Sequence, residues 1–298
     1  MRTKRLAGAI IFALFSTCNV AVFSSAAVAA PHAVVDAVQA PAWLERGERR
    51  IPLIPGMQLE NRDRVLTGSG ARAIVQLADG SAVKLGENVT VAVNAMKQDP
   101  QSGFSAALDV AKGAFRLTTD IFRKFQTQRA INVRTGTVTI GIRGTDLWGR
   151  SNDEKDFVCL IEGKISVSHP QGEPTVLDEP LQYYGADKGQ APGAVAFVDK
   201  AQLAIWSMET ELQDRAGKQQ AGGQWYLNFS RQDKDGVLDL HDRLSNAGYA
   251  SRIKPVRAAG GYLYELSLDQ LVSEGEAQAL SNRLVRDLHV PVPAIRRH

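Results

Sequence analysis

The chain has 298 residues, of which 44% are hydrophobic and 22% are charged. This composition excludes collagen-like, low-complexity and wholly disordered chains, and the length predicts about two domains. The formal net charge is +3, but without Arg2, Lys4 and Arg5 the basic and acidic residues are equal in number. Proteins that bind nucleic acid attract phosphates with an excess of positive charge. We therefore expect no nucleic-acid partner.

Residues 1–29 have the features of a secretory signal peptide. A basic start is followed by the mostly apolar stretch 6–23, and Ala27-Val28-Ala29 supplies small residues at the spacing of a cleavage site. We expect cleavage after Ala29 and a mature protein in the periplasm or elsewhere in the cell envelope.

The same segment allows two alternatives. Residues 6–30 carry no charge and are long enough to span a bilayer. We expect the protein to contact the membrane only if this segment stays uncleaved and serves as an anchor. Lipidation at Cys18 is the second alternative, although Phe15 and Thr17 stand where a lipoprotein signal has smaller residues.

Cysteine and histidine give no sign of a metal or redox site. After cleavage Cys159 is the only cysteine, so no intrachain disulfide can form. It lies in the apolar run 157–161, which predicts a buried small side chain rather than a reactive thiol. The five histidines are scattered and lack the spacing of a zinc site. We expect no metal, no cofactor and no catalytic residues.

Residues 30–214 are predicted to form an all-β domain. Short alternating runs are separated by Gly turns; Val89, Val91 and Val93, for example, have the period of two of a half-buried strand. The spacing of these strands suggests a roll, a sandwich or a short solenoid.

The end of this domain is predicted to be a helix over residues 200–214. Asp199 can cap it, and Trp206 is expected to be a packing anchor against the β domain. Residues 215–224 contain three Gly and three Gln and no large apolar residue, which predicts a linker.

The β domain resembles the FecR family in two halves. The first half includes Asp63-Arg64-Val65-Leu66-Thr67-Gly68 and Leu77-Ala78-Asp79-Gly80-Ser81. The second half includes Thr139-Ile140-Gly141-Ile142-Arg143-Gly144-Thr145-Asp146 and the segment 158–167. The resemblance implies an envelope-facing bacterial β domain of the kind found in iron-uptake signalling proteins, whose best-known members regulate a sigma factor.

The most recognisable piece of this resemblance, Arg143-Gly144-Thr145, is interpreted as structural. Gly144 allows a turn or a close backbone approach. Arg143 is expected to pair with a nearby carboxylate such as Asp146.

Residues 225–298 are predicted to form a small α+β domain. Apolar residues alternate at its start and again after Gly260-Gly261, and they recur at helical spacing in between. Ser273 and Glu276 have the spacing of a capping box ahead of the second helix. The order strand, helix, strand, strand, helix, strand is the ferredoxin-like arrangement, in which both helices cover one face of the sheet.

This order resembles a SPOR domain, with residues 226–229 opening its first half and 264–268 its second. The resemblance implies binding to peptidoglycan, with a preference for glycan strands stripped of their stem peptides. The chain departs from the family at Asn228, where Gln is usual, and at Glu265, where Arg is usual.

The sheet face opposite the helices is the candidate ligand site. If the apolar residues of the strands face the helices, alternation turns the polar ones to the other side. An aromatic ring and several hydrogen-bonding groups on a flat sheet suit a sugar chain. The candidate glycan-binding residues are Tyr226, Asn228, Arg252, Lys254, Glu265 and Ser267.

Three functions compete. The leading hypothesis is a non-enzymatic exported envelope protein, whose SPOR-like domain binds peptidoglycan glycan strands while its FecR-like domain contacts an unidentified envelope protein. The alternative is a membrane-anchored signalling regulator of the FecR type, which requires an uncleaved N-terminal anchor. The third is an enzyme acting on wall glycans, for which the sequence nominates no pair of carboxylates.

Overall fold

The computed structural model describes residues 32–99, 103–119 and 129–298. The predicted signal peptide, the alternative anchor and Cys18 lie outside the described residues. The chain from Pro31 to His298 forms one unit by its internal contacts. In the described part of the chain, no helix combines the length and the hydropathy that crossing a membrane requires.

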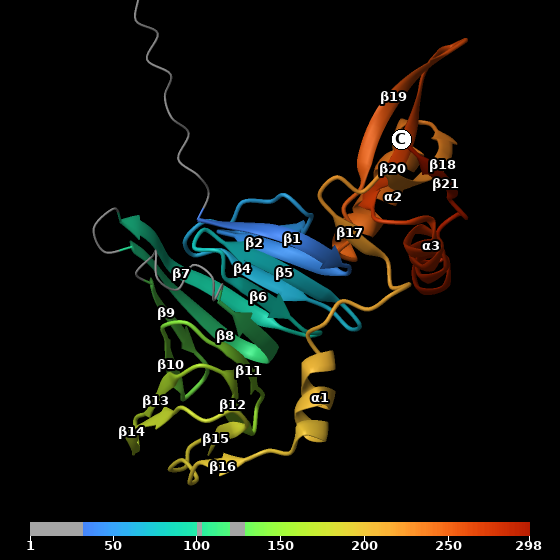
Figure 1. The fold of residues 1–298 in the computed structure, drawn as a ribbon. Coiled ribbons are helices and arrows are strands. Elements are labelled where there is room, and N and C mark those ends of the chain that lie inside the picture. Colours follow the sequence, from blue (N-terminus) through green and yellow to red (C-terminus); the bar gives the residue numbers. More distant parts are fainter. Residues whose placement is uncertain (1–31, 100–102, 120–128) are drawn as a thin grey trace, which may run out of the picture. The chain divides into compact units, whose positions relative to one another are not determined.

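Strands dominate the β-rich region, by which we mean the described residues from 32 to 197 (Figure 1). Its strands are β1 (Ala33–Gln39), β2 (Ala42–Arg46), β3 (Arg49–Pro52), β4 (Arg64–Thr67), β5 (Arg72–Leu77), β6 (Ala82–Leu85), β7 (Thr90–Asp99), β8 (Gly103–Thr118), β9 (Arg129–Arg134), β10 (Thr139–Ile142), β11 (Asp146–Ser151), β12 (Lys155–Glu162), β13 (Ile165–His169), β14 (Gly172–Leu177), β15 (Gln182–Asp187) and β16 (Ala196–Phe197). The prediction of an all-β region is therefore confirmed.

These strands form two sheets that share β8. The first sheet has the order β1, β5, β6, β8, β11, β12, β15, β16. The second has the order β3, β2, β4, β7, β8, β9, β10, β13, β14. Among these pairings β8 and β9 alone run parallel.

Gly113 marks the point at which β8 passes from the second sheet to the first. Residues of β8 up to Lys112 pair with β7, and residues from Gly113 onward pair with β11. The φ angle of Gly113 is +97°, and a Cβ atom here would lie 2.7 Å from the Cα of Val89. Only glycine fits this position, because the backbone is left-handed and the neighbouring strand is close.

The two sheets enclose one apolar core. The predicted alternation is confirmed at Val89, Val91 and Val93, which are all buried. Phe104 of β8 is among the largest fully buried side chains in the same core. Burial of each such aromatic or aliphatic side chain is worth about 1.5–3 kcal/mol, so packing carries the stability of this region.

Helix α1 (Lys200–Met208) follows the β-rich region. Asp199 is its N-cap, as predicted, because its carboxylate accepts a hydrogen bond from the backbone N–H of Gln202 at 2.7 Å. The indole ring of Trp206 stacks on that of Trp148, with ring centroids 4.9 Å apart. The predicted packing anchor is therefore confirmed.

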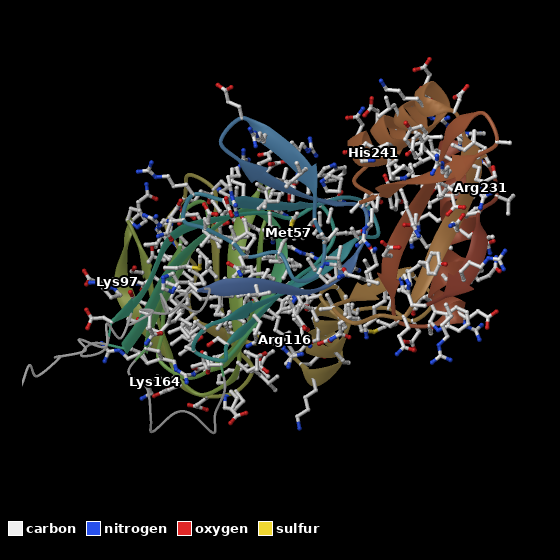
Figure 2. All side chains as sticks on the ribbon, turned by 90° about the horizontal axis from the view of Figure 1, so that it is seen from above. Met57, Lys97, Arg116, Lys164, Arg231 and His241 are labelled. Atoms are coloured by element: carbon white, nitrogen blue, oxygen red, sulfur yellow. The ribbon has the colours of Figure 1, made fainter. Side chains whose placement is uncertain are left out.

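The helix ends at Met208, before the predicted end at residue 214. Beyond it, the carboxylate of Glu211 accepts hydrogen bonds from Lys84 at 2.7 Å and from Arg116 at 3.0 Å. Lys84 and Arg116 lie on β6 and β8 of the first sheet; Arg116 is labelled in Figure 2. These contacts hold the chain in a non-helical course, which explains the early end of the helix.

The segment 215–224, predicted as a linker, contains the strand β17 (Lys218–Gln220). This strand pairs with β1 of the first sheet and, through Gln219 opposite Leu271, with the sheet that follows. Gln219 is buried. The glycines and glutamines therefore form an ordered bridge rather than a free linker, while the domain boundaries themselves stay a prediction.

The C-terminal module, residues 225–298, has the predicted order of elements. They are β18 (Trp225–Gln232), α2 (Lys234–Asn246), β19 (Arg252–Ala258), β20 (Gly261–Leu271), α3 (Glu274–Leu288) and β21 (Ala294–Arg297). The strands form an antiparallel sheet in the order β21, β18, β20, β19. The last strand begins at Ala294, after Pro291 and Pro293.

Both helices of the module cover the same face of this sheet. Leu227 and Phe229 of β18 are fully buried and share one core with apolar residues of α2 and α3. Leu240 of α2 and Leu280 of α3 are among these residues. The predicted sidedness of the sheet is therefore correct, and no helix among the described residues packs on its other face.

Candidate functional site

The helix-free face of the C-terminal module brings the predicted residues together. Asn228 of β18 lies opposite Ser267 of β20, and Ser267 lies opposite Arg252 of β19. Directly opposed residues of neighbouring strands share a face of the sheet. These three side chains therefore form one row across three strands, which we call the polar row.

Lys254 and Glu265 form the next pair along the same face. Tyr226 belongs to it as well, because it alternates with the buried Leu227 and precedes Asn228 by two residues. All six predicted residues thus lie on one face. Whether they bind a glycan stays a prediction.

Glu265 is the electrostatic centre of this face. Its carboxylate accepts a hydrogen bond from Nε of Arg231 at 2.9 Å. This bond is the main reason why the pKa of Glu265 is lowered, and a hydrogen bond from Asn228 and the charge of Lys254 act in the same direction. The carboxylate is therefore held ionised, as an acceptor among donors.

The sequence prediction missed Arg231, which is labelled in Figure 2. Strict alternation places residue 231 on the helix side, with Leu227 and Phe229. The register of β18 against β20 shifts between Phe229 and Gln232, and this irregularity brings Arg231 to Glu265. A bulge of this kind leaves no simple signal in the alternation of a strand.

Asp269 was also missed, for a different reason. Strand β20 continues to Leu271, so Asp269 extends the alternation of Glu265 and Ser267. It pairs with Arg252, with 3.3 Å between Oδ2 and Nε. Continuing the period of two by one step would have found it.

One contact limits the use of Tyr226 as a stacking platform. The Tyr226 ring stacks on the imidazole ring of His298, with centroids 4.5 Å apart and an angle of 22° between the planes. Arg296 lies directly opposite Tyr226 on β21. A sugar ring that stacks on Tyr226 must use the ring surface that His298 leaves free.

The predicted pair of Arg143 and Asp146 in the β-rich region is wrong. The carboxylate of Asp146 accepts hydrogen bonds from Nε and Nη2 of Arg116 at 2.9 and 2.6 Å. Arg116 lies on β8, which pairs with the strand of Asp146, whereas the chain turns sharply at Gly144, where φ is +127°. Gly144 therefore has the turn-forming role that the sequence predicts.

The described residues of the β-rich region contain one cysteine, which is buried, and no cluster of side chains that could hold a metal ion. Cys159 is fully buried, and burial raises the pKa of its thiol to about 12, which suppresses the reactive thiolate. Within residues 32–99, 103–119 and 129–298, no three His, Cys, Asp or Glu side chains are grouped to hold a metal ion. The prediction of a buried, inert cysteine is confirmed.

Comparison with known proteins finds a family match in the middle of the chain. Residues 63–166 match the family described as FecR protein, which confirms the resemblance of that part. No curated protein matches the chain.

Two solved structures of a proposed anti-sigma factor from Parabacteroides distasonis ATCC 8503 are similar to the chain. The 2.50 Å structure has a TM-score of 0.40 and 16% identity, covering 76% of this chain and 92% of that one. The 1.65 Å structure has a TM-score of 0.41 and 15% identity, covering 79% and 99%.

Proposed function

We propose that this protein is a non-enzymatic signalling regulator of the FecR type in the bacterial cell envelope. The observation that carries the proposal is the match of residues 63–166 to the FecR family. In this proposal the β-rich region contacts an envelope protein. The apolar segment 6–30 is retained as a membrane anchor and transmits inward whether that protein is bound.

The junction of the two regions supports a regulatory role, because it offers a mechanical connection. Strand β17 pairs with both β1 and β20. Next to it, the backbone N–H of Gln213 donates to the side-chain oxygen of buried Gln39 at 3.0 Å. Arg283 of α3 donates to the backbone oxygen of Ala40 at 2.8 Å. A conformational change caused by ligand binding to the module can therefore reach the β-rich region, because an ordered strand rather than a flexible linker connects the two.

The fate of the N-terminus tests this proposal. The full chain with a C-terminal tag is expressed in a bacterial host, membrane and soluble fractions are separated, and the N-terminal peptide is identified by mass spectrometry. We expect residues 6–30 to be present on membrane-bound protein. A mature chain that begins at Ala30 in the soluble periplasmic fraction would contradict the anchored regulator and favour the exported tether.

A second candidate function is favoured by the polar row. We propose that the C-terminal module is a ferredoxin-like domain of the SPOR type and binds peptidoglycan glycan strands. The face carries donors on Asn228 and Arg252, acceptors on Glu265 and an aromatic ring on Tyr226. Sugar hydroxyls require such donors and acceptors, and sugar C–H groups pack on rings.

Co-sedimentation of the full chain with purified peptidoglycan tests the second candidate. The wall is used before and after amidase treatment, which removes the stem peptides. Binding that increases after treatment is the expected result. Absence of binding by a chain whose fold is verified by circular dichroism would show that this face has no glycan ligand, and the module would then be examined for a protein ligand.

A further inference from the structure

The first sheet carries a hollow of about 710 Å³ beside helix α1. Strands β12 and β15 form its floor, α1 forms one wall, and the loop 188–195 between β15 and β16 forms another (Figure 1). Sites for small molecules have volumes of about 300–1,000 Å³. We call this hollow the α1 pocket; it is separate from the polar row, which belongs to the C-terminal module.

A glycine makes room in the floor of the pocket. Gly185 of β15 lies directly opposite Phe157 of β12, and Asp187 lies opposite Lys155 on the same face. A Cβ atom added at Gly185 would make only ordinary contacts, at 3.9 Å to the Tyr183 ring and 4.0 Å to the Cβ of Phe157. The space above Gly185 is therefore open, where another residue would place its side chain.

Aromatic rings line the pocket and are fixed by their own packing. Trp206 of α1 stacks on Trp148, with ring centroids 4.9 Å apart. The Phe157 ring lies 5.4 Å from that of Trp206, between centroids, at an angle of 39°. Tyr183 and Phe197 complete the aromatic lining, and Phe197 is 61% exposed. Because the Trp206 and Phe157 rings are already held in place, a ligand that packs on them has little ordering cost to overcome.

Polar side chains surround these rings. Within the described part of the chain, Lys155, Asp187, Gln190 and Gln202 line the pocket with side chains that have no hydrogen-bond or ion-pair partner. Lys155 donates hydrogen bonds, Asp187 accepts them, and the two amides do both. A wholly apolar ligand would cover these groups and leave them unpaired, which is unfavourable. The pocket therefore suits a ligand with hydrogen-bonding groups at its edge.

A sugar ring combines the two properties that the pocket requires. Its C–H groups pack on aromatic rings, and its hydroxyls donate and accept hydrogen bonds. A cationic ligand is disfavoured, because Nζ of Lys155 already lies 6.0 Å from the centroid of the Phe157 ring. The pocket also contains both signs of charge, from Lys155, Asp187 and Asp199, so it does not attract a strongly charged ligand.

We propose that the α1 pocket binds a neutral pyranose sugar. The sugar packs its C–H groups on Trp206 and Phe157, while Asp187 and Gln190 hydrogen-bond to its hydroxyls. The β-rich region thus has a ligand site of its own, in addition to any site on the C-terminal module. The inference does not depend on the proposed function.

Saturation-transfer NMR of the full chain carrying Tyr226→Ala and Asn228→Ala tests the proposal. These two changes weaken the candidate face of the C-terminal module, so that the two sites can be distinguished. The probes are maltotriose, cellotriose and tri-N-acetylglucosamine at millimolar concentration. Irradiation of the aromatic protons should transfer magnetisation to the ring C–H protons of at least one of them. Transfer to none of these sugars would overturn the proposal, and so would transfer to choline, a cationic probe, in their place.

Gly185→Val assigns the binding to the pocket. The added side chain occupies the floor, and a β-branched residue suits a strand, so sugar binding should be lost while the melting temperature stays close to that of the parent. Gly260→Val is the matched control. Gly260 also has a φ angle outside the left-handed region and open space around an added Cβ, but it lies between β19 and β20. Equal sugar binding by the two variants would overturn the assignment.

Gln190→Ala provides a test that leaves the floor unchanged. Gln190 is an exposed loop residue, so its truncation does not endanger the fold. Loss of one hydrogen bond should weaken sugar binding roughly 2- to 10-fold. Gln278→Ala, at an exposed position of α3, is the control and should bind as the parent does. Equal affinity of the two variants would contradict the role of Gln190 in holding the sugar.

Discussion

The carboxylate of Glu276, in the first turn of α3, accepts a hydrogen bond from the backbone N–H of Gly217 at 2.7 Å. The same side chain accepts three more backbone hydrogen bonds, from Arg215, Ala216 and Lys218, at 2.8 to 2.9 Å. A buried carboxylate thus accepts hydrogen bonds from four consecutive backbone N–H groups. This cluster holds the segment that leads into β17, and with it the bridge between the two sheets.

Glu276→Gln is therefore expected to destabilise the protein. The amide keeps the shape of the side chain but removes the charge that strengthens all four hydrogen bonds, and it places an NH2 group among donors. We expect a loss of about 1.5–3 kcal/mol in the free energy of unfolding, measured by urea denaturation. Glu274→Gln, an exposed residue of the same turn, is the control and should change the stability little. An equal loss of unfolding free energy in the two variants would contradict the stabilising role of the hydrogen bonds to Glu276.

The effect of Glu276→Gln should also depend on pH. Burial raises the pKa of Glu276, but the four backbone hydrogen bonds outweigh it, and the net pKa is lowered from 4.5. A lowered pKa in the folded state stabilises the protein above the unfolded value and loses this contribution as pH falls through the folded one. The stability difference between parent and variant should be complete at pH 7 and shrink below about pH 4.5. A difference independent of pH would show that the charge is not responsible.

Ser273 and Glu276 illustrate how far the sequence predicts this part of the fold. Ser273 caps α3 as the capping-box spacing predicts, and its hydroxyl accepts from the N–H of Glu276 at 3.2 Å. The Glu276 side chain, however, turns to residues 215–218 rather than back to Ser273. Local spacing identifies the helix start, but it cannot reveal a partner about 60 residues away. For the same reason a segment rich in Gly and Gln was predicted as a linker.

On the candidate face, too, the sequence predicts some residues and misses others. The period of two places Asn228 and Glu265 on the correct face, because alternation is a property of each strand alone. Arg231 reaches the face only through a register irregularity between two strands. The ion pair of Asp146 with Arg116, which replaced the predicted pair with Arg143, likewise depends on which strands are neighbours. Pairing between distant strands is the information that periodicity lacks.

Tyr226→Ala combined with Asn228→Ala is expected to weaken the binding of the full chain to amidase-treated peptidoglycan, while thermal unfolding changes little. Both side chains lie on the helix-free face, so their loss leaves no cavity in the module core. Leu227 lies between them in the sequence but is fully buried in the module core. Its truncation is the contrasting variant and should lower the melting temperature. Parallel loss of fold and binding in the double variant would count against this face as the site.

The contact between Gly248 and Trp43 allows the coupling of the two regions to be tested. Gly248 follows α2 with φ at +83°, and a Cβ atom there would lie 2.7 Å from the Trp43 ring. Its backbone oxygen accepts from the N–H of Ala42 at 3.2 Å. Gly248→Ala therefore adds both backbone strain and a clash at the junction.

Gly222→Ala is the matched control for this variant. Its φ is +84°, almost the same, but an added Cβ meets no atom within 4 Å. Both variants incur about 1–2 kcal/mol of left-handed strain, and Gly248→Ala should cost a further 1–3 kcal/mol, roughly, from overpacking. Hydrogen exchange should also be faster for the amide of Ala42 in Gly248→Ala than in Gly222→Ala. Equal stability and equal exchange in the two variants would mean that the module and the β-rich region are not tightly coupled at this contact.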